Sequence, residues 1–330
     1  MSGHHAVAQD AAGRAAAPPP PERQTFAPLR PELALRGWIS SGTTTWAHNA
    51  SAVEPTVGNP TSRLRYKDVA VNYVELSGSI RPLDRYLLRA TFGFADVGGG
   101  RLTDDDFVSN QGATTFNTAT PGAQRVSRTI SDIKGDASWY LELEGGGRLL
   151  NYPGHRGGLD GFVGYRYWYQ RHIATGVGQV DCTSPTFCDP IGTVSHKRQD
   201  VIRNAQTWHA LELGLESDYR LFRWLSLHTK GAFLPVNLFT NDDVHVLRSD
   251  LQQNPSFRMN GWGIGGNLEA SLRAEVVPKL CMEVGYRLWW NQMVDGTWKN
   301  FPTSGGGVSV PLQEFSSIRQ GLTVGLRYTF

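Results

Sequence analysis

Apolar and polar residues alternate along most of the chain, as they do in β-strands whose two faces meet different surroundings. The C-terminal stretch SIRQGLTVGLRYTF (317–330) is the clearest case. One of its faces carries Ile318, Leu322, Val324, Leu326, Tyr328 and Phe330. The other face carries Arg319, Thr323, Arg327 and Thr329. Residues 86–94, 137–144, 262–276 and 280–290 repeat the pattern.

A soluble β-sandwich also alternates, so strand length is needed to choose between the two architectures. Strands of globular proteins usually run about 5–6 residues. Several of the runs here are roughly twice that long or more, which suits strands that cross a bilayer at a tilt and continue beyond it. The pattern therefore favours a transmembrane β-barrel over a sandwich.

Ten strands are expected, an even number as in single-chain bacterial barrels. Their approximate ranges are 33–46, 65–80, 83–97, 134–147, 158–173, 203–219, 222–240, 258–276, 279–297 and 313–330. The connections alternate between short and long, and outer-membrane barrels place the long ones outside the cell. We therefore predict an all-β fold, a ten-stranded antiparallel transmembrane β-barrel with long extracellular loops. The long loops are expected at about 47–64, 98–133, 174–202, 241–257 and 298–312.

Composition is consistent with this fold. The formal net charge is only +2 and the charges are scattered, so no nucleic-acid partner is expected. No window approaches eighteen consecutive apolar residues, which excludes a transmembrane helix. The chain holds 37 Gly, 10 Trp and 11 Tyr, and Trp and Tyr favour membrane–water interfaces. Interfacial positions are expected for Trp38, Trp139, Trp168, Trp224, Trp262 and Trp289.

The first 30 residues differ from the rest and are rich in Ala and Pro. We expect residues 1–30 to be a disordered lead and 31–330 to form the barrel. No signal peptide is evident, although AVA before Gln9 is similar to the end of a cleavage site, so the true signal is expected upstream. Cys182 and Cys188 could form a loop disulfide in an oxidising compartment.

Two acidic clusters mark the expected extracellular end. Asp104, Asp105 and Asp106 follow the third strand, and NDDVH (241–245) follows the seventh. Strands three and seven stand nearly opposite each other in a ring of ten. Alternation gives Asp104 and Asp106 one face, and it gives Asp243 and His245 one face. A carboxylate beside His245 is expected to orient the imidazole and raise its pKa, and the facing carboxylates are expected to hold a water.

At these residues the sequence resembles the omptins, ten-stranded outer-membrane endopeptidases of Gram-negative bacteria. GGGRLTDDDFVS matches the family's Asp-x-Asp segment and TNDDVHV its Asp-x-His segment. The resemblance covers roughly 35–330. It implies an aspartyl-type hydrolase in which Asp104, Asp106, Asp243 and His245 are catalytic. A water between the Asp pair and His245 attacks the peptide carbonyl, and Asp243 orients His245. No metal or other cofactor is implied.

The family binds a basic substrate side chain in an acidic pocket, and here the sequence departs from it. Asn241 occupies one acidic position, and the other falls near Trp46. Asp242 or Glu54 could compensate, so Asn241, Asp242 and Trp46 are the expected substrate-binding residues. The family also requires lipopolysaccharide as an activator, bound on the outer wall. Arg166 and Arg171 in GYRYWYQR (164–171) are the corresponding lipid-binding candidates.

The expected partners are a peptide or protein substrate and the outer membrane with its lipopolysaccharide, around a monomer whose site faces outward. The alternative is a non-catalytic barrel, an adhesin or scaffold with an eroded site. Calcium binding by residues 104–106 is a further possibility for the acidic cluster. A passive porin fits less well, because inward charges would fill so narrow a barrel.

Overall fold

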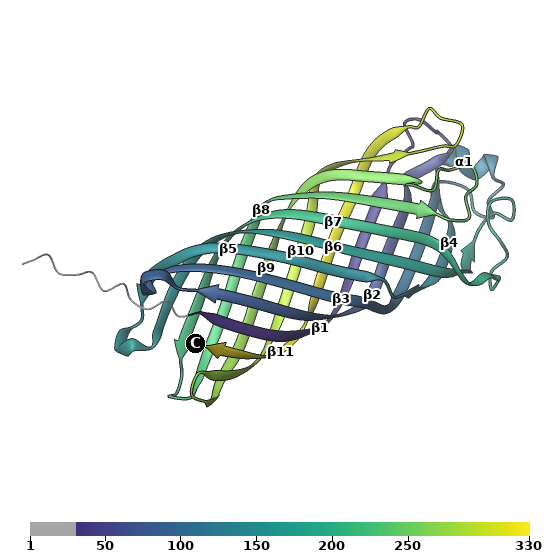
Figure 1. Ribbon diagram of the computed structural model, residues 1–330. Helices are drawn as coiled ribbons and strands as arrows, with labels where there is room; N and C mark the ends of the chain where they lie inside the picture. Colours follow the sequence, from purple (N-terminus) through teal and green to yellow (C-terminus); the bar gives the residue numbers. More distant parts are fainter. Residues whose placement is uncertain (1–30) are drawn as a thin grey trace, which may run out of the picture.

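The computed structural model describes residues 31–330, which form one closed barrel of antiparallel strands (Figure 1). The expected disordered lead, residues 1–30, lies outside the described residues. The strands are β1 Glu32–His48, β2 Val57–Ile80, β3 Tyr86–Val108, β4 Gln124–Lys134, β5 Ala137–Asn151, β6 Gly157–Cys182, β7 Val194–Arg220, β8 Leu225–His245, β9 Phe257–Val277, β10 Leu280–Asn300 and β11 Ser309–Thr329. Three short helical segments connect them: η1 Pro82–Asp84, α1 Asn110–Thr115 and η2 Pro153–His155. In residues 31–330 no helix has the length and apolar character that a bilayer crossing requires.

The ring closes through β1, which pairs with both β2 and β11. Between β3 and β6, a single place in the ring is shared by two strands: β4 pairs with both neighbours toward one end of the barrel, and β5 toward the other. The strand pairing is interrupted between β4 and β5, at residues 135–136. A Cβ atom added to Gly135 would lie 2.7 Å from the Val97 carbonyl oxygen. The predicted ring of ten is therefore confirmed, with its fourth strand split and extended to residue 124.

The alternation of short and long connections is also confirmed. The turns after β2, β5, β7 and β9 are short, and Figure 1 shows them at the end that holds the C-terminus. The longer connections, with α1, gather at the other end. The expected loop boundaries were wrong, because strands such as β6 and β7, with 26 and 27 residues, continue far past the length that a bilayer needs. As a result, residues 104–106 and 243–245 belong to strands.

The outward face over the middle of the barrel is apolar, and the inward face is filled. Val74 is 63% exposed and Val163 is 57% exposed, which suits contact with lipid. Inside, aromatic rings pack across the lumen, with Trp289 4.9 Å from both Trp38 and Tyr140 and 5.3 Å from Trp168. The interfacial assignment of Trp38, Trp168 and Trp289 was therefore wrong, because all three fall on the inward face of their strands. Trp224 and Trp262 do face outward.

Buried ion pairs fill the lumen around these rings. Arg287 lies 2.6 Å from Glu75 and 2.7 Å from Glu269, and Arg36 bonds the same two carboxylates. Arg273 pairs with Glu283 in the same network. The inward charges that were expected to fill the barrel therefore pair with one another across it. A lumen filled in this way offers no passive channel.

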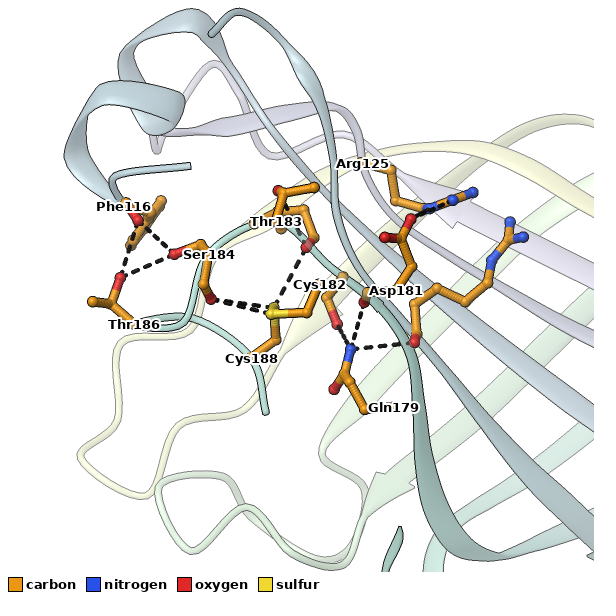
Figure 2. The surroundings of a disulfide bond; sticks show 12 residues. Phe116, Arg125, Gln179, Asp181, Cys182, Thr183, Ser184, Thr186 and Cys188 are labelled. Atoms are coloured by element: carbon orange, nitrogen blue, oxygen red, sulfur yellow. Dashed lines mark hydrogen bonds and ion pairs between the residues drawn. A yellow bond between two sulfur atoms is a disulfide. The ribbon is translucent and has the colours of Figure 1, made fainter. Parts of the chain in front are cut away.

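Cys182 and Cys188 are joined as a disulfide at the start of the connection between β6 and β7 (Figure 2). Next to it, the hydroxyls of Ser184 and Thr186 both donate to the Phe116 carbonyl at the end of α1. The disulfide therefore fixes the shape of this loop, and the hydrogen bonds of Ser184 and Thr186 hold the loop against α1.

Replacing both cysteines by serine should loosen that loop and leave the barrel intact. The disulfide closes only a short segment at the edge of the fold, so its loss acts on local opening rather than on global unfolding. Limited proteolysis should cut the variant faster within 183–193, while its thermal unfolding matches that of the wild type. A lower unfolding temperature would contradict this assignment.

Candidate active site

At the end of the barrel that carries the long connections, β3 turns two carboxylates toward the lumen and one away from it. Asp104 and Asp106 share the inward face, and the Ser62 hydroxyl on β2 donates to Asp104 over 3.2 Å. Asp105 faces outward and forms two hydrogen bonds with Arg128 of β4, at 2.6 and 2.8 Å. Since the three carboxylates do not converge, the calcium site considered for this cluster is not formed.

The end of β8 supplies the second half of the site. Asp243 is fully buried, and within residues 31–330 neither of its carboxylate oxygens has a hydrogen bond of ordinary geometry. The Nε2 atom of His245 lies 3.8 Å from Asp243 Oδ1, which is an approach without a hydrogen bond. The rings of His245 and Phe257 pack edge to face, with their centroids 4.8 Å apart. The backbone N–H of His245 donates a hydrogen bond to the Ser256 hydroxyl. The predicted Asp–His pairing is therefore present in a loose form.

The two halves lie on separated walls of the barrel, since β4/β5, β6 and β7 stand between β3 and β8 in the ring. The side chains nevertheless act on one another across the lumen. Burial is the main cause that raises the pKa values of Asp104 and Tyr66, and Asp243, when ionised, raises both further. Closure of the barrel thus places all four predicted catalytic residues at the same open end of the lumen, which we call the mouth.

Burial keeps a proton on the Asp104 and Asp106 pair. Burial raises the pKa of Asp106 to about 6, and burial together with the charge of Asp106 holds the pKa of Asp104 well above its usual range. Two close carboxylates in a dry setting cannot both ionise easily. The pair therefore gives up its protons less readily than two exposed carboxyl groups do.

Burial also sets the protonation of the dyad, by which we mean Asp243 and His245. Its effect on the pKa of His245 is opposite to the one expected from the sequence. The pKa of His245 is lowered to about 3 by burial and by the nearby charge of Arg248. The prediction that Asp243 raises it was wrong, because burial raises the pKa of Asp243 itself to about 8 and keeps it uncharged. Between these two values the dyad holds one proton, so His245 is unprotonated and can accept another.

Of the expected substrate-binding residues, Asn241 and Trp46 face the lumen and Asp242 does not. Asp242 lies on the outer face with Arg258, at 2.6 Å, which corrects its assignment. Glu54 is exposed in the connection between β1 and β2 and bonds Thr56, so it does not compensate either. The buried Asn241 amide contacts only Met259, at 3.2 Å, among the described residues.

Sequence reasoning missed the aromatic column beside the dyad. Phe257 packs beside His245 and also against Trp298, with the Phe257 and Trp298 ring centroids 4.8 Å apart. Trp298 in turn stacks on His48, with ring centroids 4.1 Å apart. These rings come from β9, β10 and β1. Their common inward register was the available signal, but only ring closure makes them neighbours.

The two lipid-binding candidates separate onto opposite faces. Arg166 is buried in the lumen over the Trp289 ring, 3.5 Å from Glu212, so its assignment to the outer wall was wrong. Arg171 does face outward and pairs with Asp136 at 3.2 Å. Tyr165, Tyr167 and Tyr169 lie below it on the same face of β6.

Within residues 31–330, one cluster has ligand-bearing side chains close enough for a metal ion. Glu216, Asp218 and His228 bring ligand atoms within 4.8 Å of one another at the opposite end of the barrel. Arg89 already pairs with Glu216, and Arg273 pairs with Asp218 at 2.7 Å. This cluster is therefore part of the internal ion-pair network.

Comparison with known proteins supports the fold. No family model and no curated protein matches the sequence. Among solved structures, the outer membrane protease OmpT from Escherichia coli aligns with a TM-score of 0.70 at 16% identity, over 94% of this chain and 99% of that chain. A FadL homologue of Pseudomonas aeruginosa aligns at a TM-score of 0.30 and 10% identity, over 92% and 90%, a likeness too weak to carry an argument. This chain thus has the fold of Gram-negative outer-membrane β-barrels and is similar in its architecture to OmpT.

Proposed function

We propose that this protein is an omptin-like outer-membrane endopeptidase that hydrolyses peptide bonds at the extracellular mouth of its barrel. The observation that carries the proposal is the meeting of Asp104 and Asp106 with Asp243 and His245 across one lumen. Buried carboxylates that lack partners are costly to stability, and they persist mainly where chemistry needs them. Likeness to OmpT in fold is consistent with this function.

The proposed reaction uses one water and no covalent intermediate. The water lies between the Asp104/Asp106 pair and His245, and its oxygen attacks the peptide carbonyl while His245 takes one of its protons. The protonated carboxyl of the pair donates a hydrogen bond to the carbonyl oxygen as charge develops there. The proton on His245 then passes to the leaving nitrogen as the C–N bond breaks. Asp243 orients His245 throughout.

The setting of this reaction is also part of the proposal. The mouth faces the cell exterior, a monomer suffices, and lipopolysaccharide acts as an activator on the outer wall. Arg171 and the tyrosines below it present a charged and aromatic outer surface at the height where such a lipid's headgroup would lie. No metal or other cofactor takes part.

A peptide panel tests the proposal. Refolded protein with lipopolysaccharide should cleave at least one member of a broad library that varies the residue before the scissile bond. Cleavage should persist with a metal chelator present. Failure to cleave any peptide, with barrel folding verified by circular dichroism, would favour the alternative of a non-catalytic adhesin or scaffold.

The rate should show a bell-shaped dependence on pH, with its maximum near neutrality. Activity rises as Asp106 ionises at a pKa of about 6 and falls as the dyad loses its proton at a pKa of about 8. The measurement is kcat/KM between pH 4 and 10, because it reports the free enzyme. A rate that climbs steadily to pH 10 would contradict the assigned protonation states.

A further inference from the structure

Tyr66 of β2 is a buried group that the proposed reaction does not use. Its side chain is 0% exposed, and its hydroxyl has no hydrogen-bond partner among the described residues. A buried phenol normally finds a partner, because leaving its hydroxyl unpaired in a dry interior costs free energy. The burial of an unpaired hydroxyl at this position therefore suggests that it serves a function.

The register of the sheet places Tyr66 between the two halves of the site. On its own side, β2 pairs Tyr66 with Leu102 and Leu64 with Asp104, so Tyr66 and Asp104 share the inward face of neighbouring strands. On the far side, the Tyr66 ring packs on His172 of β6, with ring centroids 5.1 Å apart. Tyr66 therefore spans the lumen beneath the mouth.

On the opposite wall, Tyr66 reaches a row of three residues that lie side by side on the neighbouring strands β6, β7 and β8. His172 pairs with Asn204 of β7, and Asn204 pairs with Asp243 of β8. All three are buried, and within residues 31–330 none of their polar side-chain atoms has a hydrogen bond of ordinary geometry, although the Asn204 side chain lies close enough to Asp243 to favour its ionised form. The row ends at the catalytic carboxylate, and Tyr66 packs on its first member.

We propose that Tyr66 is a positioning residue of the proposed peptidase site, whose hydroxyl, unpaired within the described residues, donates a hydrogen bond through one water to the facing carboxylate of Asp104 or of Asp243. The hydroxyl favours the ionised form of whichever carboxylate it bonds. It thereby helps to set where the water is held and at which pH the site is active. This inference rests on the proposed function.

The other charged and titratable groups facing this position do not replace the hydroxyl. Asp106 and His245 belong to the site itself, and His48 and His172 are uncharged at neutral pH because burial lowers their pKa values to about 4 and about 3. Arg319 is engaged with Ser40, Gln170 and the Val69 carbonyl, and Arg248 is paired with Asp250. Tyr66 is thus a hydroxyl donor without a partner among the described residues, and it lies between the two halves of the site.

Tyr66→Phe tests the inference, because phenylalanine keeps the ring on His172 and removes only the hydroxyl. We expect kcat to fall about 10- to 100-fold with KM little changed. Losing a hydrogen bond to the ionised form raises a carboxyl pKa, so the alkaline limb of the pH profile, which follows Asp243, should move upward by about one unit, while the acid limb, which follows Asp106, stays in place. The matched control is Tyr73→Phe, which removes a buried hydroxyl that bonds Ser138 and Trp168 away from the site. The control should leave the profile unchanged.

An activity-independent measurement separates this inference from the proposed function. Infrared titration of the buried carboxyl groups, assigned with Asp104→Asn and Asp243→Asn, should show an upward shift in Tyr66→Phe even if the wild type cleaves no peptide. An inactive wild type with shifted carboxyls would reject the peptidase and keep the hydrogen bond. Titration curves that coincide in wild type and Tyr66→Phe would overturn the inference.

Discussion

Asp243→Ala and His245→Ala should each abolish peptide cleavage, with kcat/KM reduced on the order of 10³-fold or more. Asp243→Ala removes the group that orients the imidazole, and His245→Ala removes the base that takes the proton from water. The double variant should be little worse than either single one, because residues that act as a unit are not additive. The measurement is steady-state cleavage of the best peptide from the library.

The adjacent residue supplies the control for this loss. Asp242 carries the same charge one position away, but it faces outward and pairs with Arg258. Asp242→Ala should therefore keep nearly full activity. On β3, Asp105→Asn should likewise be tolerated, whereas Asp104→Asn should be inactive. Equal losses at Asp242 and Asp243 would mean that the assigned faces of β8 are wrong.

Arg287→Ala should be the most destabilising single substitution among the lumen ion pairs, at about 3–5 kcal/mol. Removing this guanidinium leaves Glu75 and Glu269 with less positive charge in a buried network that water does not reach freely. Breaking a buried pair from one side costs far more than the pair contributes as a whole, because the remaining charge stays desolvated. Urea unfolding of the barrel refolded into lipid vesicles measures the change.

Arg258→Ala is the matched control for that loss. Arg258 also pairs with a carboxylate, at 2.6 Å, but both side chains are more than 40% exposed. An exposed pair contributes about 0–1 kcal/mol, so this variant should unfold close to the wild type. Similar losses in the two variants would contradict the view that the Arg287 network is desolvated.

Alternation along the chain was enough to predict the ring of ten, the parity of the connections and the end at which the two acidic clusters lie. It was also enough to pair Asp104 with Asp106 and Asp243 with His245, since a period of two is a property of the extended backbone itself. Residue type alone misplaced Trp38, Trp168 and Arg166. Each is a residue common at membrane surfaces, yet the register of its strand turns it into the lumen.

What the sequence by itself determined is therefore the class of fold, the order of its strands and the faces that neighbouring residues share, because these depend on local periodicity and turn position. The tertiary structure alone decided which residues meet across the lumen. Tyr66, the row from His172 to Asp243, and the column from His245 to His48 come from strands far apart in the chain. The tertiary structure also decided the protonation states at the mouth, because desolvation depends on what closes over a carboxylate and not on its neighbours in sequence.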